Sequence, residues 1–281
     1  MIKSRTWSFV IVAIVYLLAT AVGVVTYLLL PFEFWLNLLI ADAVATAITF
    51  LFSVSLENAS VYDPYWSVQP IVILFAFFPY GEGNGASVLL LVAVAVWGVR
   101  LTANWAYTFH GLEHQDWRYT HLKEQTGKWY PLVNFFGIHL VPTLVVFGCV
   151  LPAVFIMQAQ PQLNFGSVAF FTLSLLAVLL QGTADCQMHE FRKTKRKGFI
   201  RTGLWKYSRH PNYLGEIAFW WGIGLSAVCA MPDKWWLLGG AIANTLLFLC
   251  ISIPLADGRQ SKKQGFAEYK RATRMLLPIK K

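Results

Sequence analysis

The segment RTGLWKYSRHPNYLGEI, at residues 201–217, is strongly polar within a chain of 281 residues that is otherwise mostly apolar. Arg209 and His210 bring a cation and hydrogen-bond donors to a point where the next residue, a proline, favours the start of a helix. The first N–H groups of a helix lack partners within the helix, and the helix dipole is positive there, so such a start binds anions. Asn212 lies at this start, and Glu216 lies one turn later, where it could bind ribose hydroxyls or an amide. The segment therefore predicts a site for an anionic, phosphate-bearing cofactor.

A second polar stretch, DCQMHEFRKTKRKGFIR at 185–201, continues an apolar run as a basic extension. Asp185, His189 and Arg192 are spaced so that they share one face of a helix. The further basic residues between 193 and 197 scatter around that helix, so we interpret them as solvated or lipid-facing charges. The shared face is the part of this stretch that we expect to bind a ligand.

Ionisable side chains are rare within the apolar runs, and such residues are functional candidates because burying them in lipid is costly. Asp63, Arg100, Asp185 and Glu216 all fall toward the same ends of their runs. This common depth predicts a shared polar cavity that opens to the cytoplasm. The alternative is a set of ion pairs that fix helix packing, such as Arg100 with an aspartate. For Asp42, midway along its run, we favour a packing role.

The elements that must position these residues are long apolar helices. The chain is 57% hydrophobic and 13% charged, whereas a soluble domain has about 25% charged residues. The first run, Trp7–Leu30, has no charged residue over 24 positions, and about 20 residues suffice to cross a bilayer. Similar runs recur at about 34–56, 65–80, 86–109, 135–158, 165–184, 212–231 and 235–256. Because only helices satisfy backbone polar groups within single segments in lipid, we expect an all-α, polytopic membrane bundle with seven or eight transmembrane helices.

The distribution of Lys and Arg predicts the orientation of this bundle. With eight spans, both termini are cytoplasmic, and the segments on that side are 1–6, 57–64, 110–134, 185–211 and 257–281. These segments hold 21 of the 23 Lys and Arg residues, in agreement with the positive-inside rule. The membrane topology then explains the net charge of +9. Binding of anionic lipids or of an anionic cofactor could contribute to it, and a nucleic-acid partner is not needed to explain it.

The number of spans depends on the third run, which is short. It crosses the membrane only if its helix begins near Tyr62; otherwise there are seven spans and the N-terminus lies on the other side. We expect one integral membrane domain over residues 1–281. The first run is too long for a signal peptide, so we expect it to be retained. The four cysteines are dispersed, which predicts neither a metal site nor a disulfide.

The stretch GLWKYSRHPNYLGEI resembles the C-terminal signature of the steroid 5-alpha-reductase-like superfamily, which includes sterol C14 and delta-7 reductases and an uncharacterised membrane subgroup. The ending GFAEYKRATRMLLPIKK is similar to the closing helix of that superfamily. HQDWRY at 114–119 resembles a motif of the uncharacterised subgroup, as do Asn58, Asp63 and Trp66. The resemblance covers roughly 55–281, and a helix within 1–33 is additional to the seven-helix core.

The resemblance implies NADPH at the cytoplasmic end of the bundle and hydride transfer to a polarised C=C bond of a steroid or another lipid that enters from the bilayer. Together with the helical face described above, it assigns cofactor binding to a set of polar residues, with the last two as weaker candidates for a phosphate. These residues are Asn58, Asp185, His189, Arg192, Arg209, His210, Asn212, Tyr213, Glu216, Arg259 and Lys262.

The resemblance is weakest at the catalytic residues. Steroid reductases use a Gln-Glu pair and a tyrosine to polarise an enone oxygen, and DPYWSVQP aligns with the stretch that contains the glutamate. This places Tyr62 and Asp63 at the pair, whereas the counterpart of the tyrosine falls near Arg100. An aspartic acid that apolar surroundings keep protonated could donate to a carbonyl oxygen, with Tyr62 or Tyr107 as second donor. We therefore expect Asp63, Tyr62, Arg100 and Tyr107 to be catalytic.

Two other functions remain open. The run from Arg209 to Gly215 also fits the pattern of isoprenylcysteine carboxyl methyltransferases, which bind S-adenosylmethionine, but the stretch CISIPLADGRQ at 250–260 lacks their later acidic feature. The second open function is that of a non-catalytic lipid-binding membrane protein, which would retain the pocket but catalyse no reaction. We expect no metal in any of these cases. The membrane is the endoplasmic reticulum in a eukaryote or the inner membrane in a bacterium.

Overall fold

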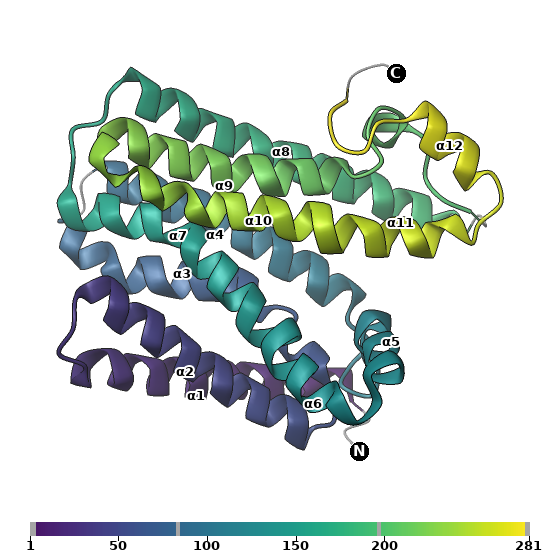
Figure 1. Ribbon diagram of the computed structural model, residues 1–281, viewed down its shortest axis with the longest axis horizontal. Coiled ribbons are helices and arrows are strands. Elements are labelled where there is room, and N and C mark those ends of the chain that lie inside the picture. The colour runs from purple at the N-terminus through teal and green to yellow at the C-terminus, as the bar shows by residue number, and fades with distance from the viewer. Residues whose placement is uncertain (1–3, 83–84, 196–197, 279–281) are drawn as a thin grey trace. The chain divides into compact units, whose positions relative to one another are not determined.

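A computed structural model describes residues 4–82, 85–195 and 198–278 of the chain. Over these residues the fold consists of helices and the turns between them, with no strand (Figure 1). Of the basic residues between 193 and 197, those at 196 and 197 lie outside the described residues. The prediction of an all-α protein is confirmed.

Seven helices in the described residues are long and apolar enough to cross a membrane, so the chain is an integral membrane protein. They are Arg5–Leu29, Phe34–Ser55, Gly85–Thr108, Trp117–Ala159, Phe165–Lys193, Pro211–Ala230 and Pro232–Ser261. The third apolar run is not among them, because it forms α3 (Tyr65–Phe77) of only 13 residues, and about 20 are needed. The side of the membrane on which the termini lie stays a prediction.

The chain divides into two compact units, which we describe separately. Unit 1 comprises Met1–Glu82 and Val94–Phe147. Its helices are α1 (Arg5–Leu29), α2 (Phe34–Ser55), α3, the later part of α4 (Gly85–Thr108), α5 (Trp117–Thr126), α6 (Tyr130–Leu132) and the start of α7 (Val141–Ala159). Its short 3₁₀ helices are η1 (Ala59–Tyr62), η2 (Phe78–Gly81) and η3 (Gly127–Trp129), and η4 (Val133–Leu140) is a π-helix.

Hydrogen bonds at one end of unit 1 fix the turn that carries Tyr62 and Asp63. The Asn58 side chain accepts from the Ser60 N–H (2.8 Å) and donates to the Leu112 carbonyl (2.6 Å). The Leu112 N–H in turn donates to the Ser8 hydroxyl (3.0 Å). The start of α1, the turn after α2 and the loop after α4 are therefore held together. Asn58, which we expected to bind a cofactor, uses its side chain to build this turn.

Close packing of α3 on α4 holds the other side of unit 1. Gly98 lies directly against the Ser67 carbonyl and Ile71, so that a Cβ at Gly98 would collide with the backbone of α3. The Ser67 and Thr102 hydroxyls are 2.9 Å apart at the same crossing. A residue without a side chain is required here because the two backbones approach closely.

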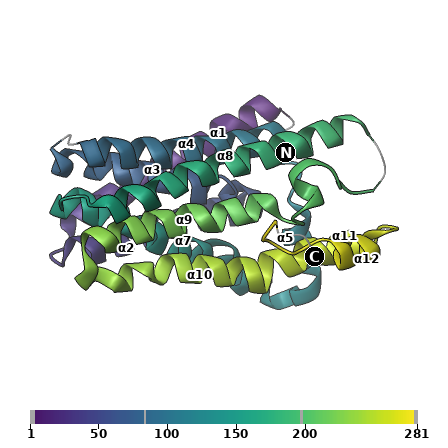
Figure 2. The same cartoon turned by 90° about the horizontal axis from the view of Figure 1, so that it is seen from above.

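Unit 2 comprises Gly83–Ala93 and Gly148–Lys281. Its elements, besides the parts of α4 and α7 that it shares, are α8 (Phe165–Lys193), η5 (Gly203–Lys206), α9 (Pro211–Ala230), η6 (Pro232–Leu238), α10 (Gly239–Leu247), the π-helix η7 (Phe248–Ser252), α11 (Ile253–Ser261) and α12 (Phe266–Ala272). Figures 1 and 2 both show α8, α9 and α10 side by side. Gly215 and Gly222 of α9 lie against the backbone of α8, which lets these two helices pack along their length.

The polar segments of unit 2 meet at one end of it. The Arg209 N–H donates to the Arg274 carbonyl (2.9 Å), and the Tyr269 hydroxyl donates to the Trp205 carbonyl (2.5 Å). The Lys263 ammonium donates to the Gly198 carbonyl (2.7 Å). The C-terminal segment therefore packs on the segment before α9, as expected for two segments predicted to lie on the same side of the membrane.

Replacing Gly98 by alanine should lower the thermal stability of the detergent-solubilised protein. The added methyl group would press on the α3 backbone, and overpacking of this kind costs about 1–3 kcal/mol. Gly85→Ala is the matched control, because no atom lies within 4 Å of a Cβ at that position. Equal melting temperatures for the two variants would contradict the close approach of α3 and α4.

Candidate functional site

A buried carboxylate organises the end of unit 2. Asp257, on α11, accepts from the Arg209 guanidinium (3.0 Å) and contacts His210 Nε2 at 3.0 Å. The Lys270 ammonium lies 3.6 Å from the same carboxylate. Asp257, Arg209 and His210 are all buried. A buried charge needs partners of opposite sign, and this cluster supplies them from the start of α9 and from α12.

Arg209 also holds the C-terminal segment in place. Its guanidinium donates to the carbonyls of Thr273 (2.7 Å) and Lys270 (3.4 Å). The His210 ring stacks on Tyr213, with ring centroids 5.2 Å apart and an interplanar angle of 6°. Arg209 and His210 therefore stabilise the fold through most of their polar atoms, which the sequence did not indicate.

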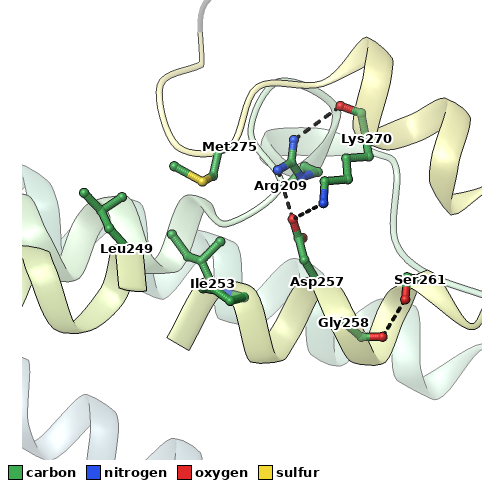
Figure 3. Close-up of a pocket in the computed structure, with 9 residues that line it drawn as sticks. Arg209, Leu249, Ile253, Asp257, Gly258, Ser261, Lys270 and Met275 are labelled. Carbon is green, nitrogen blue, oxygen red and sulfur yellow. Dashed lines mark hydrogen bonds and ion pairs between the residues drawn. The ribbon is translucent and has the colours of Figure 1, made fainter. Parts of the chain in front are cut away.

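A pocket of about 420 Å³ lies beside this cluster (Figure 3). Pockets for small molecules measure about 300–1,000 Å³. Its lining residues are Arg209, Leu249, Ile253, Pro254, Asp257, Gly258, Ser261, Lys270 and Met275. Figure 3 shows Arg209 and Lys270 reaching toward Asp257, with the apolar side chains of Leu249, Ile253 and Met275 grouped at the other end of the pocket. The pocket is thus charged at one end and apolar at the other.

Two buried polar atoms at the start of α9 make no hydrogen bond to any described residue. They are Arg209 Nε, a donor, and Asn212 Oδ1, an acceptor. Buried polar groups normally have partners, so a site with one free donor and one free acceptor fits a ligand that carries both. A phosphate oxygen could accept from Arg209, and an amide or hydroxyl could donate to Asn212. These residues therefore fit the cofactor class expected from the sequence.

A second group of cations gathers where α8 and α11 end. Partial burial and then the neighbouring Arg259 and Arg192 lower the pKa of the Lys263 ammonium. Like charges repel, so a fold that brings them together favours an anion between them. Arg192 and Arg259, from our predicted set, are thus brought together with Lys263, which that set omitted. Lys262, the neighbouring candidate, is exposed to solvent.

Glu216 lies inside the helix packing of unit 2 and is 4% exposed. Its two carboxylate oxygens accept from Gln181 Nε2 (3.1 Å) and Trp220 Nε1 (2.9 Å). Trp220 follows Glu216 by four residues on the same helix, a spacing that could have indicated this contact. Asp185 and His189, also predicted to bind the cofactor, are half-buried on α8.

Asp63, in unit 1, forms a close pair with Tyr119 of α5. The Tyr119 hydroxyl donates to the Asp63 carboxylate (2.5 Å), and Arg118 lies 3.9 Å from it. Burial raises the pKa of Asp63 to about 6, although Arg118 and Tyr119 act in the opposite direction. Asp63 therefore changes between acid and carboxylate near neutral pH. HQDWRY contains Tyr119, yet the sequence did not indicate that this tyrosine would reach Asp63.

The other predicted catalytic residues lie elsewhere in unit 1. The Tyr62 hydroxyl is hydrogen-bonded to the Thr143 hydroxyl at 2.8 Å. Tyr107 is 60% exposed on the surface of α4, and Arg100 is half-buried on the same helix. In unit 1, the tyrosine hydroxyl that reaches Asp63 is therefore that of Tyr119, and not that of Tyr62 or Tyr107.

The fold and the two polar clusters define a polytopic membrane protein with a pocket that can hold a small molecule. Residues 49–273 match the family described as "Protein of unknown function (DUF1295)", and the chain belongs to this family. The family is steroid 5-alpha-reductase-like, which confirms the superfamily that the sequence resembles.

Two curated relatives are similar to parts of the chain. The chain is 29% identical over 197 residues to an uncharacterized protein of Schizosaccharomyces pombe, which covers 60% of this chain and 57% of the relative. It is 37% identical over 68 residues to the Protein-S-isoprenylcysteine O-methyltransferase of Saccharomyces cerevisiae, which covers 21% of this chain and 28% of that enzyme. The matches thus span little more than half of the first relative and about a quarter of the second. No solved structure matches the chain.

Replacing Asp257 by asparagine should destabilise the protein by about 3 kcal/mol, because Arg209 would remain buried without a counter-charge. Thermal unfolding in detergent measures this loss. Asp233→Asn is the matched control, since Asp233 pairs with Lys234 through a side chain that is 71% exposed. A melting temperature for Asp257→Asn equal to that of the control would show that the buried pair does not support the fold.

Replacing Asp63 by asparagine should change how stability depends on pH. The pKa of Asp63 is about 6 in the folded protein, above the ordinary value near 4, so the unfolded chain ionises first as the pH rises. Between pH 5 and pH 8 the wild type should therefore lose about 1 kcal/mol relative to the Asn variant. The comparison uses chemical or thermal unfolding at both pH values, and a constant difference would contradict the raised pKa.

Proposed function

We propose that the chain is a membrane-embedded reductase that uses NADPH to reduce a polarised C=C bond of a steroid or other lipid. The observation that carries the proposal is the convergence of Arg192, Arg259 and Lys263 where α8 and α11 end. NADPH carries several phosphate charges, and arginine binds phosphate well because its guanidinium donates two parallel hydrogen bonds. The free donor of Arg209 and the free acceptor of Asn212 add hydrogen-bonding groups at the start of α9.

The Asp63–Tyr119 pair would polarise the substrate. In its protonated form, Asp63 donates a hydrogen bond to the carbonyl oxygen of an enone, which lowers the electron density at the β-carbon. Tyr119 donates to Asp63 and thereby orients the acid. Exclusion of water strengthens this polarisation. NADPH, when bound, would supply the hydride of the reduction.

A methyltransferase that uses S-adenosylmethionine is the second candidate. It is supported by the similarity of 68 residues to the Saccharomyces cerevisiae Protein-S-isoprenylcysteine O-methyltransferase. S-adenosylmethionine has a positive sulfonium and no phosphate. A cluster of three cations would therefore attract NADPH and would contribute less to S-adenosylmethionine, which is why we favour the reductase.

Binding measurements can separate these candidates. The purified protein, which contains 12 tryptophans, would be titrated with NADPH, NADH and S-adenosylmethionine while tryptophan fluorescence is followed. We expect NADPH to bind most tightly, with an affinity that falls as salt rises. Arg259→Ala should weaken NADPH binding about tenfold, the loss expected for one charged hydrogen bond.

Lys234→Ala provides the control, because it removes one positive charge from η6, away from the cluster. Its affinity for NADPH should equal that of the wild type. Binding of S-adenosylmethionine together with no response to NADPH would overturn the reductase proposal and support the methyltransferase.

A further inference from the structure

A chain of buried polar side chains crosses unit 1 between α2, α3, η1 and α7. It begins at Asp42, which is 6% exposed. The Tyr65 hydroxyl contacts one oxygen of Asp42 (3.0 Å), and Gln69 Nε2 donates to the other (2.5 Å). The ion pairs among the described residues include none at Asp42. Since an unpaired carboxylate is costly in apolar surroundings, the protonated acid is the favoured form here.

Hydroxyl groups continue the chain from Asp42 to Tyr62. Thr46 is a hydrogen-bonding neighbour of the Tyr65 hydroxyl. The Thr46 and Thr143 hydroxyls are 2.9 Å apart, and Thr143 and Tyr62 are 2.8 Å apart. Each hydroxyl can both accept and donate, so the whole chain can point in one direction. A proton that leaves Tyr62 can therefore be replaced from Asp42 by successive transfers along the chain.

The far end of this chain lies in the same buried cluster as the proposed substrate-polarising pair. Tyr62, Tyr65 and Tyr119 belong to one cluster, and Tyr62 directly precedes Asp63. The Tyr62 ring stacks on Tyr65 with centroids 5.3 Å apart. The chain thus connects an acid midway along α2 to the neighbourhood of the Asp63–Tyr119 pair.

A comparison with Thr49 separates this chain from ordinary helix packing. The Thr49 hydroxyl, one turn from Thr46 on α2, donates to the carbonyl of Ala45 on its own helix (3.0 Å). Thr46 and Thr143 instead bond to each other across two helices. Thr143 lies in the first turn of α7, just after the π-helix η4, and π-helical turns are frequent at functional sites. An asparagine at position 42 would keep one acceptor oxygen and the size of the side chain, but it could not store a proton.

We propose that Asp42 is a positioning residue that stores the proton for the reduction and supplies it to Tyr62 through Tyr65, Thr46 and Thr143. This inference rests on the proposed reductase activity. Reduction of an enone consumes one hydride and one proton. Addition of the hydride forms a C–H bond at the β-carbon, breaks the π bond and oxidises the reduced nicotinamide.

The proton completes the reaction at the α-carbon. The resulting enolate takes a proton from Tyr62, and the Tyr62 oxygen regains one from Thr143. Thr143, Thr46 and Tyr65 are each reprotonated from the preceding group, so that Asp42 ends as a carboxylate. A proton from water then restores the acid. All atoms and charges balance with the reduced nicotinamide and one proton as the co-reactants.

Infrared spectroscopy tests the stored proton without any substrate. The measurement uses Asp63→Asn protein at pH 6, so that Asp63, whose pKa is about 6, contributes no acid band. This protein should show the C=O band of a buried carboxylic acid, and a further Asp42→Asn substitution should remove it. Thr143→Val should shift the band, whereas Thr49→Val should leave it unchanged. Absence of any band that depends on Asp42 would overturn the proposal.

Turnover tests the path itself. Oxidation of NADPH would be followed with a 3-oxo-Δ4 steroid as the probe. Asp42→Asn and Thr143→Val should each lower kcat about 100-fold, within the range for a positioned proton donor, while NADPH affinity and KM stay constant. Thr49→Val should remain within about twofold of the wild type, because its hydroxyl lies outside the path.

The proposed reductase activity and the proton path from Asp42 can be refuted separately. A wild type that does not bind NADPH would refute the proposed reductase, and the infrared band would then decide separately whether Asp42 stores a proton. A kcat for Asp42→Asn equal to that of the wild type, with normal NADPH binding, would refute the proton path alone.

Discussion

The constraint that governs this protein is the cost of leaving a polar group without a partner in hydrocarbon. It forces the chain into helices, and it favours a hydrogen-bond partner for buried polar side chains. Asp42 finds Tyr65 and Gln69, Glu216 finds Gln181 and Trp220, and Asp257 finds Arg209. Helix packing and the polar clusters therefore depend on each other, because each cluster fixes the helices that supply its members.

The same constraint changes what the polar segment before α9 can do. Most of the polar atoms of Arg209 and His210 are occupied by Asp257 and by the C-terminal segment. What remains for a ligand is Arg209 Nε, Asn212 Oδ1 and the nearby cations. Building the pocket and binding the proposed cofactor would thus fall to different atoms of the same side chains. This sharing would couple occupancy of the pocket to the stability of the C-terminal segment.

The sequence predicted the helices well because hydropathy is a local property. The run expected at 212–231 forms α9 at Pro211–Ala230, and the basic extension after 184 continues α8 to Lys193. The pairing of Asp63 with Tyr119 could not be predicted, because 56 residues separate them and their contact depends on how α5 returns to η1. Whether the chain behaves as one domain, and on which side its termini lie, stay predictions from composition and charge.

By itself, the sequence determined that this is an all-helical membrane protein, because runs of apolar residues in lipid leave the backbone no other way to satisfy its hydrogen bonds. It also predicted that the start of α9 and the segments rich in Lys and Arg bind a cofactor, and this stays a prediction. The tertiary structure decided the partners: Tyr119 for Asp63, Asp257 for Arg209, and Thr143 for Tyr62. Partner choice depends on distances of about 3 Å between side chains far apart in the sequence, and only the packing of the helices sets those distances.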